Sequence, residues 1–113
     1  MSQDFYQNIF DLVKLIPKGR IYTYGLIAKS LGSPQASRVV GYAMHQSLQI
    51  DADIPAHRVV NRLGILTGKH HFATGTLMQE LLEAEGHTII KDRIQDFENK
   101  LWNPMEHFES LLP

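Results

Sequence analysis

A chain of 113 residues with 43% hydrophobic and 20% charged side chains predicts one globular domain over residues 1–113 with a single core. The absence of cysteine excludes disulfides, thiolate metal sites and cysteine catalysis. No run is apolar enough to span a membrane, and the first residues carry no secretory signal. We therefore expect a soluble cytoplasmic protein without a membrane partner, nucleoid-associated in a bacterium and nuclear in a eukaryote.

The net charge of −1 hides an asymmetry along the chain. Residues 1–69 carry a net charge of +4 and residues 70–113 a net charge of −5, and five basic residues but no acid lie between Asp11 and Asp51. Such local bias is typical of a surface that binds a polyanion. An ordinary solvated basic surface is the alternative.

The beginning of the chain is predicted to form two helices. Apolar residues at helical spacing indicate an amphipathic helix over residues 3–16, which Pro17-Lys18-Gly19 ends with a turn. Residues 21–23 favour a short extended link. Thr23 is expected to cap a second helix over Tyr24–Leu31, because its hydroxyl can accept an N–H of the first helical turn.

A third helix, predicted over residues 34–47, has the clearest pattern. Gly32 is expected to end the preceding helix, with Ser33 as the next N-cap and Pro34 at the first helical position. At 100° per residue, one face is small and apolar, whereas the other carries a cation, a bare backbone position and two aromatic rings. The inner face holds Ala36, Val39, Val40, Ala43 and Met44, and the outer face holds Arg38, Gly41, Tyr42 and His45. Two helices with this short turn and outer face predict a helix-turn-helix, although a plain surface helix can look similar.

Less regular structure is expected in the middle of the chain. Residues 47–56 lack periodicity and are interpreted as a connector. Turn-forming residues at 61–64, between two short apolar runs, predict a small hairpin or wing. Residues 67–74 are expected to form a flexible polar loop.

The last third is predicted to return to regular structure. A helical stripe beginning near Thr76 is ended by Gly86 and directs the Glu85 carboxylate towards the core. Residues 87–90 indicate a strand, and the acidic tail, with Trp102, is expected to pack over the domain. The predicted fold class is thus mainly α with a small β component.

The stretch Ile54-Pro55-Ala56-His57-Arg58-Val59-Val60-Asn61-Arg62 resembles the active-site signature of the O6-alkylguanine-DNA alkyltransferases, Pro-Cys-His-Arg-Val, at four positions of five. Ala56 stands where that family has its nucleophilic cysteine. Residues 16–28, 37–44 and 85–87 resemble further family segments in the same order and spacing. The chain is therefore identified as an alkyltransferase-like member of this family.

The resemblance implies a winged-helix-like domain that binds duplex DNA through the minor groove and flips the damaged guanine into a pocket. Arg38 resembles the arginine finger that replaces the flipped base, and Tyr24 resembles the tyrosine that presses on the 3′ phosphate. Tyr42 departs from the family, which tends to have small residues there. The implied DNA-binding residues are Tyr24, Gly25, Ser33, Ser37, Arg38, Gly41, Tyr42 and Arg62.

The implied damaged-base pocket has Ala56 as its floor. His57 and Glu85 resemble the relay that deprotonates the family's cysteine, and without a thiol we expect them to support the pocket instead. Arg58 is expected to anchor the same loop through backbone carbonyls. The full set of pocket residues is Pro55, Ala56, His57, Arg58, Val59, Asn61, Lys69 and Glu85.

Three of the remaining assignments are less specific. Asn61 is a candidate for joining the signature loop to the third helix, and Lys69 either covers the modified base or is an ordinary surface lysine. The adjacent His70 and His71 cannot easily share one metal ion, so we expect no metal and no cofactor.

Three functions remain open at this level. The first is a non-enzymatic sensor that binds O6-alkylguanine in duplex DNA as a monomer and passes it to nucleotide excision repair proteins, because no nucleophile replaces the cysteine. The second is a winged-helix regulator that reads sequence instead of damage; the retained pocket residues count against it. The third is an enzyme with a substitute nucleophile, although no serine-hydrolase, phosphate-loop or zinc-protease motif supports it.

Overall fold

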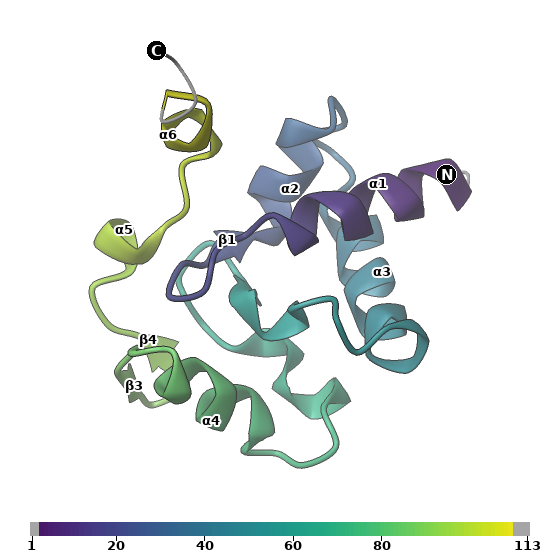
Figure 1. Ribbon diagram of the computed structural model, residues 1–113. Coiled ribbons are helices and arrows are strands. Elements are labelled where there is room, and N and C mark those ends of the chain that lie inside the picture. Colours follow the sequence, from purple (N-terminus) through teal and green to yellow (C-terminus); the bar gives the residue numbers. More distant parts are fainter. Residues whose placement is uncertain (1–2, 110–113) are drawn as a thin grey trace.

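The computed structural model describes residues 3–109, which form a mainly helical fold with two small sheets (Figure 1). The α-helices are α1 (Gln3–Lys14), α2 (Tyr24–Ser30), α3 (Ser37–Ile50), α4 (Leu77–Ala84), α5 (Phe97–Lys100) and α6 (Pro104–Glu109). Two 3-10 helices, η1 (Ala56–Arg58) and η2 (Thr67–His71), and four strands, β1 (Tyr22–Thr23), β2 (Val59–Val60), β3 (Ile89–Ile90) and β4 (Arg93–Ile94), complete the fold. The predicted fold class is confirmed. No helix within residues 3–109 is long and apolar enough to cross a membrane.

Helices α2 and α3 pack against each other as the predicted helix-turn-helix. Thr23 caps α2, because its Oγ1 accepts the Leu26 N–H at 3.1 Å. The prediction for the start of α3 is wrong. Pro34 lies inside a turn closed by the Ala36 N–H and the Ser33 carbonyl at 2.9 Å, so Ser33 is not the N-cap and the helix begins three residues later. The fixed φ of proline suits the second position of a turn as well as the first position of a helix.

The two faces of α3 are as predicted. The inner residues are buried, apart from the half-buried Val39, and Arg38, Tyr42 and His45 on the outer face are exposed. The helix continues to Ile50, through a segment expected to be irregular. Buried Ser47 explains this continuation, because its hydroxyl donates to the Met44 carbonyl at 2.6 Å and needs no partner outside the helix.

The parallel pairing of β1 with β2 joins the two halves of the site. Tyr22 lies opposite Val59, and Thr23 opposite Val60, so the start of α2 lies beside η1. Trp102 covers this pair, as expected for that residue, whereas the end of the predicted tail, residues 110–113, lies outside the described residues. The Trp102 N–H donates to the Ile21 carbonyl at 2.8 Å, and its ring packs edge-on against Tyr22 with centroids 5.1 Å apart.

The predicted hairpin at residues 61–64 is wrong. Val60 pairs with β1, whereas Ile65 forms an isolated bridge to Arg93, so the two flanking runs pair with different partners. The antiparallel hairpin is instead β3–β4, whose two turn residues both have positive φ, as a tight two-residue turn requires. Likewise, the predicted polar loop at 67–74 contains η2, and the predicted strand from His87 begins only at Ile89.

Candidate nucleic-acid interface

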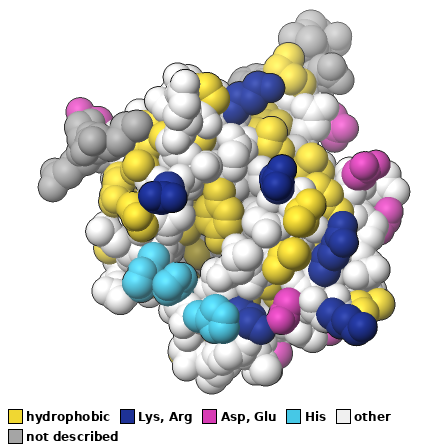
Figure 2. All heavy atoms as spheres, turned by 180° about the vertical axis from the view of Figure 1, so that it is seen from behind, with side chains coloured by type: hydrophobic (Ala, Val, Ile, Leu, Met, Phe, Trp, Pro, Cys, Tyr) yellow, Lys and Arg dark blue, Asp and Glu magenta, His cyan; other side chains and the backbone are white. Residues whose placement is uncertain are grey.

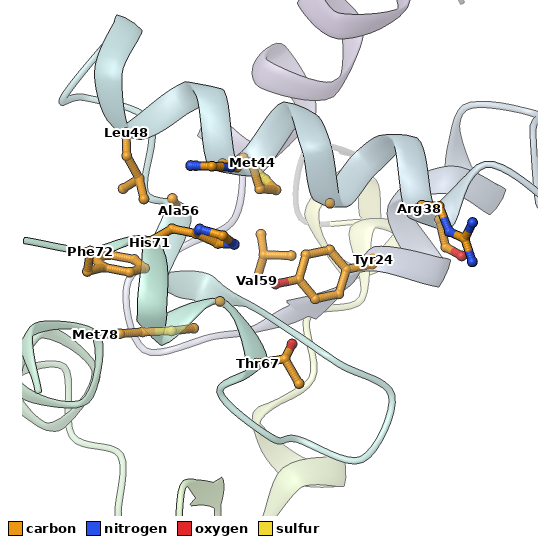
Figure 3. Close-up of a pocket in the computed structure, with 14 residues that line it drawn as sticks. Tyr24, Arg38, Met44, Leu48, Ala56, Val59, Thr67, His71, Phe72 and Met78 are labelled. Atoms are coloured by element: carbon orange, nitrogen blue, oxygen red, sulfur yellow. The ribbon is translucent and has the colours of Figure 1, made fainter. Parts of the chain in front are cut away.

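A cavity of about 380 Å³ lies beside α3, and residues of α2, η1, β2, η2 and α4 form its other walls (Figure 3). Six of the predicted site residues line it: Tyr24, Ser37, Arg38, Gly41, Ala56 and Val59. Eight further lining residues were not predicted: Met44, His45, Leu48, Thr67, Gly68, His71, Phe72 and Met78. Its volume is in the range of pockets that hold small molecules. The face shown in Figure 2 has a hollow with an apolar floor, bordered by basic and histidine side chains.

The cavity lies where two hydrophobic clusters meet. One cluster is formed mainly by α1, α2 and α3 and includes Ala56 and Val59, whereas the other, around α4 and the β3–β4 hairpin, includes Met78. Phe72 packs against both clusters. Ala56 is 7% exposed and offers only a methyl group to the cavity. The position that the signature assigns to a nucleophile is therefore apolar.

Behind Ala56, a carboxylate at the end of α4 binds two other segments, η1 and the turn after α1. The Glu85 Oε2 atom accepts from His57 Nε2 at 2.7 Å and from Arg58 Nη2 at 2.8 Å, and Oε1 accepts the Gly19 N–H at 3.2 Å. The sequence places Glu85 here because Gly86, with φ of 96°, ends α4 just after it. Arg58 also donates to the Ile16 carbonyl at 2.9 Å, as its predicted anchoring role requires.

The network fixes the charge of Glu85. Burial alone would raise the pKa of this carboxyl, but the hydrogen bonds from Arg58, His57 and the Gly19 N–H outweigh burial and hold the pKa at about 2. His57 and Arg58 do not line the cavity; with Pro55 they line a second hollow on the other side of Ala56. These predicted pocket residues thus support the floor from outside.

Tyr24 forms one side of the cavity, with its ring directed inwards above Thr67 (Figure 3). Burial raises the pKa of Tyr24, and a hydrogen bond with Thr67 opposes this rise. A Cβ at Gly68 would lie 3.1 Å from the Tyr24 hydroxyl, so the glycine leaves room for that group. Neither Thr67 nor Gly68 stands out in the sequence as a partner of a distant tyrosine.

The polar edge of the cavity belongs to the first half of α3. Arg38 lies in the first turn, and its guanidinium points away from the Tyr24 ring (Figure 3). It makes no hydrogen bond or ion pair to any side chain of residues 4–106, the side chains that the structure describes, so it is available to a ligand. One turn later, Gly41 has no atom within 4 Å of where a Cβ would lie. The packing of the protein therefore does not require a glycine here, but the missing side chain lets another molecule approach the helix backbone closely.

Four predicted DNA-binding residues lie outside the cavity. Gly25 and Arg62 are exposed, at the start of α2 and in the 61–64 turn, and Ser33 is half-buried in the turn before α3. Tyr42 is 57% exposed and borders a neighbouring shallow hollow together with Tyr6.

Two predicted pocket residues are engaged elsewhere. Lys69 Nζ pairs with Asp92 Oδ2 at 2.6 Å, so it does not cover the cavity. The Asn61 side chain accepts the N–H groups of Leu63 and Ile65 at 2.9 and 2.8 Å. It therefore stabilises its own turn and does not join the signature loop to α3, which is a common use of asparagine in turns. For Lys69 the structure agrees with the alternative of an ordinary surface lysine, whereas Asn61 does not make the connection predicted for it.

His45 and His71 approach each other across the cavity. Their rings stack with centroids 3.8 Å apart and planes 21° from parallel. Among the side chains that the structure describes, those of residues 4–106, no group of three or more histidine, cysteine, aspartate or glutamate residues could hold a metal ion.

These features define a class: a helix-turn-helix domain with a small-molecule-sized cavity beneath its third helix and an alanine at the floor. The model of the 6-O-methylguanine DNA methyltransferase DNA-binding domain matches residues 4–87. The chain therefore belongs to the 6-O-methylguanine DNA methyltransferase family.

Some of the similar proteins are named methyltransferases, and others are named alkyltransferase-like or base-flipping proteins. Alkyltransferase-like protein 1 of Schizosaccharomyces pombe is 33% identical over 89% of this chain and 96% of its own length. The DNA base-flipping protein of Escherichia coli is 36% identical over 90% of this chain and 77% of its own length. The crystal structure of S. pombe Atl1 in complex with DNA containing O6-carboxymethylguanine has a TM-score of 0.80 at 32% identity, over 92% of this chain and 99% of that one. The chain spans about half the length of the methylated-DNA–protein-cysteine methyltransferases that it also matches.

Proposed function

We propose that this chain binds duplex DNA containing O6-alkylguanine, holds the flipped base in the cavity above Ala56 and leaves the alkyl group in place. One observation carries the proposal: the cavity and the His57–Glu85 support are complete, but a methyl group occupies the reactive position. A methyl carbon has no lone pair with which to displace an alkyl group. The names of the similar alkyltransferase-like and base-flipping proteins support the same function.

The DNA would be bound by α3 in the minor groove. Gly41 allows close approach of the helix backbone, and Ser37 can donate to a phosphate. Arg38, at the edge of the cavity, would enter the duplex and take the place of the flipped base. Tyr24 would press on the phosphate of the flipped nucleotide from the opposite edge, while exposed Tyr42 would limit how deeply α3 inserts.

A complex that holds a lesion without removing it needs a second protein to complete repair. We propose nucleotide excision repair as that route. A reconstituted excision reaction on an O6-methylguanine duplex would test it: this chain should increase incision at the lesion, and Arg38→Ala should not. No increase would contradict the hand-over and leave lesion binding intact.

A titration tests the central proposal. Two duplexes of identical sequence, one with O6-methylguanine and one with guanine, are compared at several salt concentrations. We expect at least about a tenfold preference for the lesion and weaker binding as salt rises, because phosphate contacts release counterions. Mass spectrometry of protein and DNA afterwards should find the alkyl group still on the base. Equal affinity for the two duplexes would favour a sequence-specific regulator, and alkylated protein would show a substitute nucleophile.

A further inference from the structure

A histidine pair at the rim of the cavity has no role in the function proposed above. His45 comes from α3 and His71 from η2, so the stacked rings connect the helix to the opposite wall. Both side chains are exposed to solvent and both line the cavity, and His71 is labelled in Figure 3. A nucleotide held in the cavity would therefore lie against them.

The surroundings of the pair favour an anion. No acidic side chain of the described residues lines the cavity or the shallow hollow that His45 also borders. Lys69, on the same 3-10 helix as His71, is already paired with Asp92 at 2.6 Å. The other titratable or charged side chains around the pair are Tyr6 on α1, Tyr24 on α2, Arg38 and Tyr42 on α3, and His70 on η2, while η1 and α4 contribute only Ala56 and Met78 to the cavity.

Two stacked imidazoles can hold one proton more readily than two. A protonated ring still stacks on a neutral one, whereas two cations at this separation repel each other. Partial desolvation of the His71 ring, together with the neighbouring His45 and His70, lowers the pKa of His71. The pair can therefore gain a charge when a ligand supplies the opposite one.

We propose that the His45–His71 pair is the anion-binding element of the cavity, which takes up one proton and donates a hydrogen bond to an anionic oxygen of the flipped nucleotide. Two oxygens have this chemistry: the phosphate next to the flipped base, and a carboxylate on the O6 arm, such as the carboxymethyl group. The inference rests on the proposed function and extends it by making lesion binding depend on pH.

The experiment measures affinity at pH 6, 7 and 8 for three duplexes. They carry O6-methylguanine, O6-carboxymethylguanine, and O6-methylguanine beside a neutral methylphosphonate linkage, with a guanine duplex as reference for general binding. Relative to that reference, affinity should rise by up to about tenfold per unit of pH decrease, since one proton is bound with the lesion. His45→Phe and His71→Phe retain an aromatic ring without a titratable group and should flatten this rise. His70→Phe, the matched control on the same 3-10 helix, should retain it.

The results separate the two sources of the anion. If affinity for both lesions with a natural backbone rises as the pH falls, and the methylphosphonate abolishes this rise, the contact is to the phosphate. If affinity rises for the carboxymethylguanine duplex alone, the contact is to the O6 arm. An NMR titration should show the pKa of His71 rising on binding in either case. Equal pH dependence in the native protein and both phenylalanine variants would overturn the inference while lesion preference persists. Absence of lesion preference at every pH would overturn the proposed function as well.

Discussion

The two sides of Ala56 are built on different principles. Towards α3, the wall consists of apolar groups, a glycine surface and an arginine without a partner among residues 3–109. On the opposite side, Glu85 satisfies donors from Gly19, His57 and Arg58 at once. The first side is available to a ligand, and the second is saturated internally.

This difference gives His57 and Glu85 a structural role that does not require the alkyl-transfer chemistry of the signature. Glu85 joins the end of α4 to the signature loop and to the turn after α1, so its loss would leave buried donors unpaired. A histidine and a carboxylate in an alkyltransferase-like site are therefore not evidence of catalysis. Whether the residue at position 56 can act as a nucleophile decides whether such a site can catalyse alkyl transfer.

The largest expected effect concerns the saturated side. Glu85→Ala should lower the free energy of unfolding by about 3 kcal/mol, because Arg58 and His57 lose their shared acceptor while partly buried. Thermal or urea denaturation measures this loss. Glu83→Ala, an exposed carboxylate of the same helix, is the control and should change stability by less than about 0.5 kcal/mol. Similar losses in the two variants would show that the network is not structural.

The pH dependence of stability should report the same carboxylate. Its pKa of about 2 is below the ordinary value of 4.5, so the folded state binds this proton less readily than the unfolded state does. The contribution of Glu85, on the order of 2–3 kcal/mol, is present above pH 4.5 and is lost as the pH falls towards 2. Glu85→Gln should reduce the slope of stability against pH in this window, measured by denaturant titrations at each pH. An unchanged slope would assign the acid sensitivity to other groups.

On the open side, Arg38→Ala should reduce affinity for an O6-methylguanine duplex more than about tenfold and leave stability unchanged, because the proposed partner of Arg38 is DNA and it pairs with no described side chain. Fluorescence titration and thermal denaturation measure the two effects. Arg38→Lys distinguishes the possible roles: an arginine that stacks in the duplex is not replaced by lysine, whereas a phosphate contact is. Recovery of affinity by lysine would contradict the finger role.

Gly41→Ala should have the smallest effects, and it should change stability and DNA affinity in opposite directions. Gly41→Ala places a methyl group where no atom lies within 4 Å, so it should stabilise α3 by up to about 1 kcal/mol. The same methyl group should weaken DNA binding a few-fold, because it raises the helix surface at the proposed groove contact. Denaturation and titration of one variant provide both values. Equal or tighter DNA binding would remove Gly41 from the interface.

The sequence is sufficient to predict those parts of the site that lie on helices with a regular hydrophobic pattern. The faces of α3 and the inward direction of Glu85 follow from helical spacing alone. The start of α3 does not, because Pro34 is compatible with a turn and with a helix start. Local pattern also cannot show that Lys69 has Asp92 as its partner, since that pair joins segments that meet only in the folded chain.

The cavity wall formed by η2 and Phe72 could not be predicted for the same reason, because it too depends on contacts between distant segments. Thr67, Gly68, His71 and Phe72 come from a polar stretch without periodicity, and their position follows from contacts at residues 65 and 66. Ile65 bridges Arg93, and the Leu66 N–H donates to the Asp92 carbonyl at 2.9 Å. The β3–β4 hairpin therefore determines where η2 lies, and no motif near η2 in the sequence records this.

The parallel pairing of Tyr22–Thr23 with Val59–Val60 has a consequence for the order of folding. Parallel strands cannot form from a local hairpin, and closing a loop of this length is slow compared with forming helices. An intermediate with α2 and α3 in place but this pair open would have a helix-turn-helix and no cavity floor. General affinity for DNA and recognition of a damaged base would thus be acquired at different stages, and a newly synthesised chain could hold the duplex before it could distinguish one guanine from another.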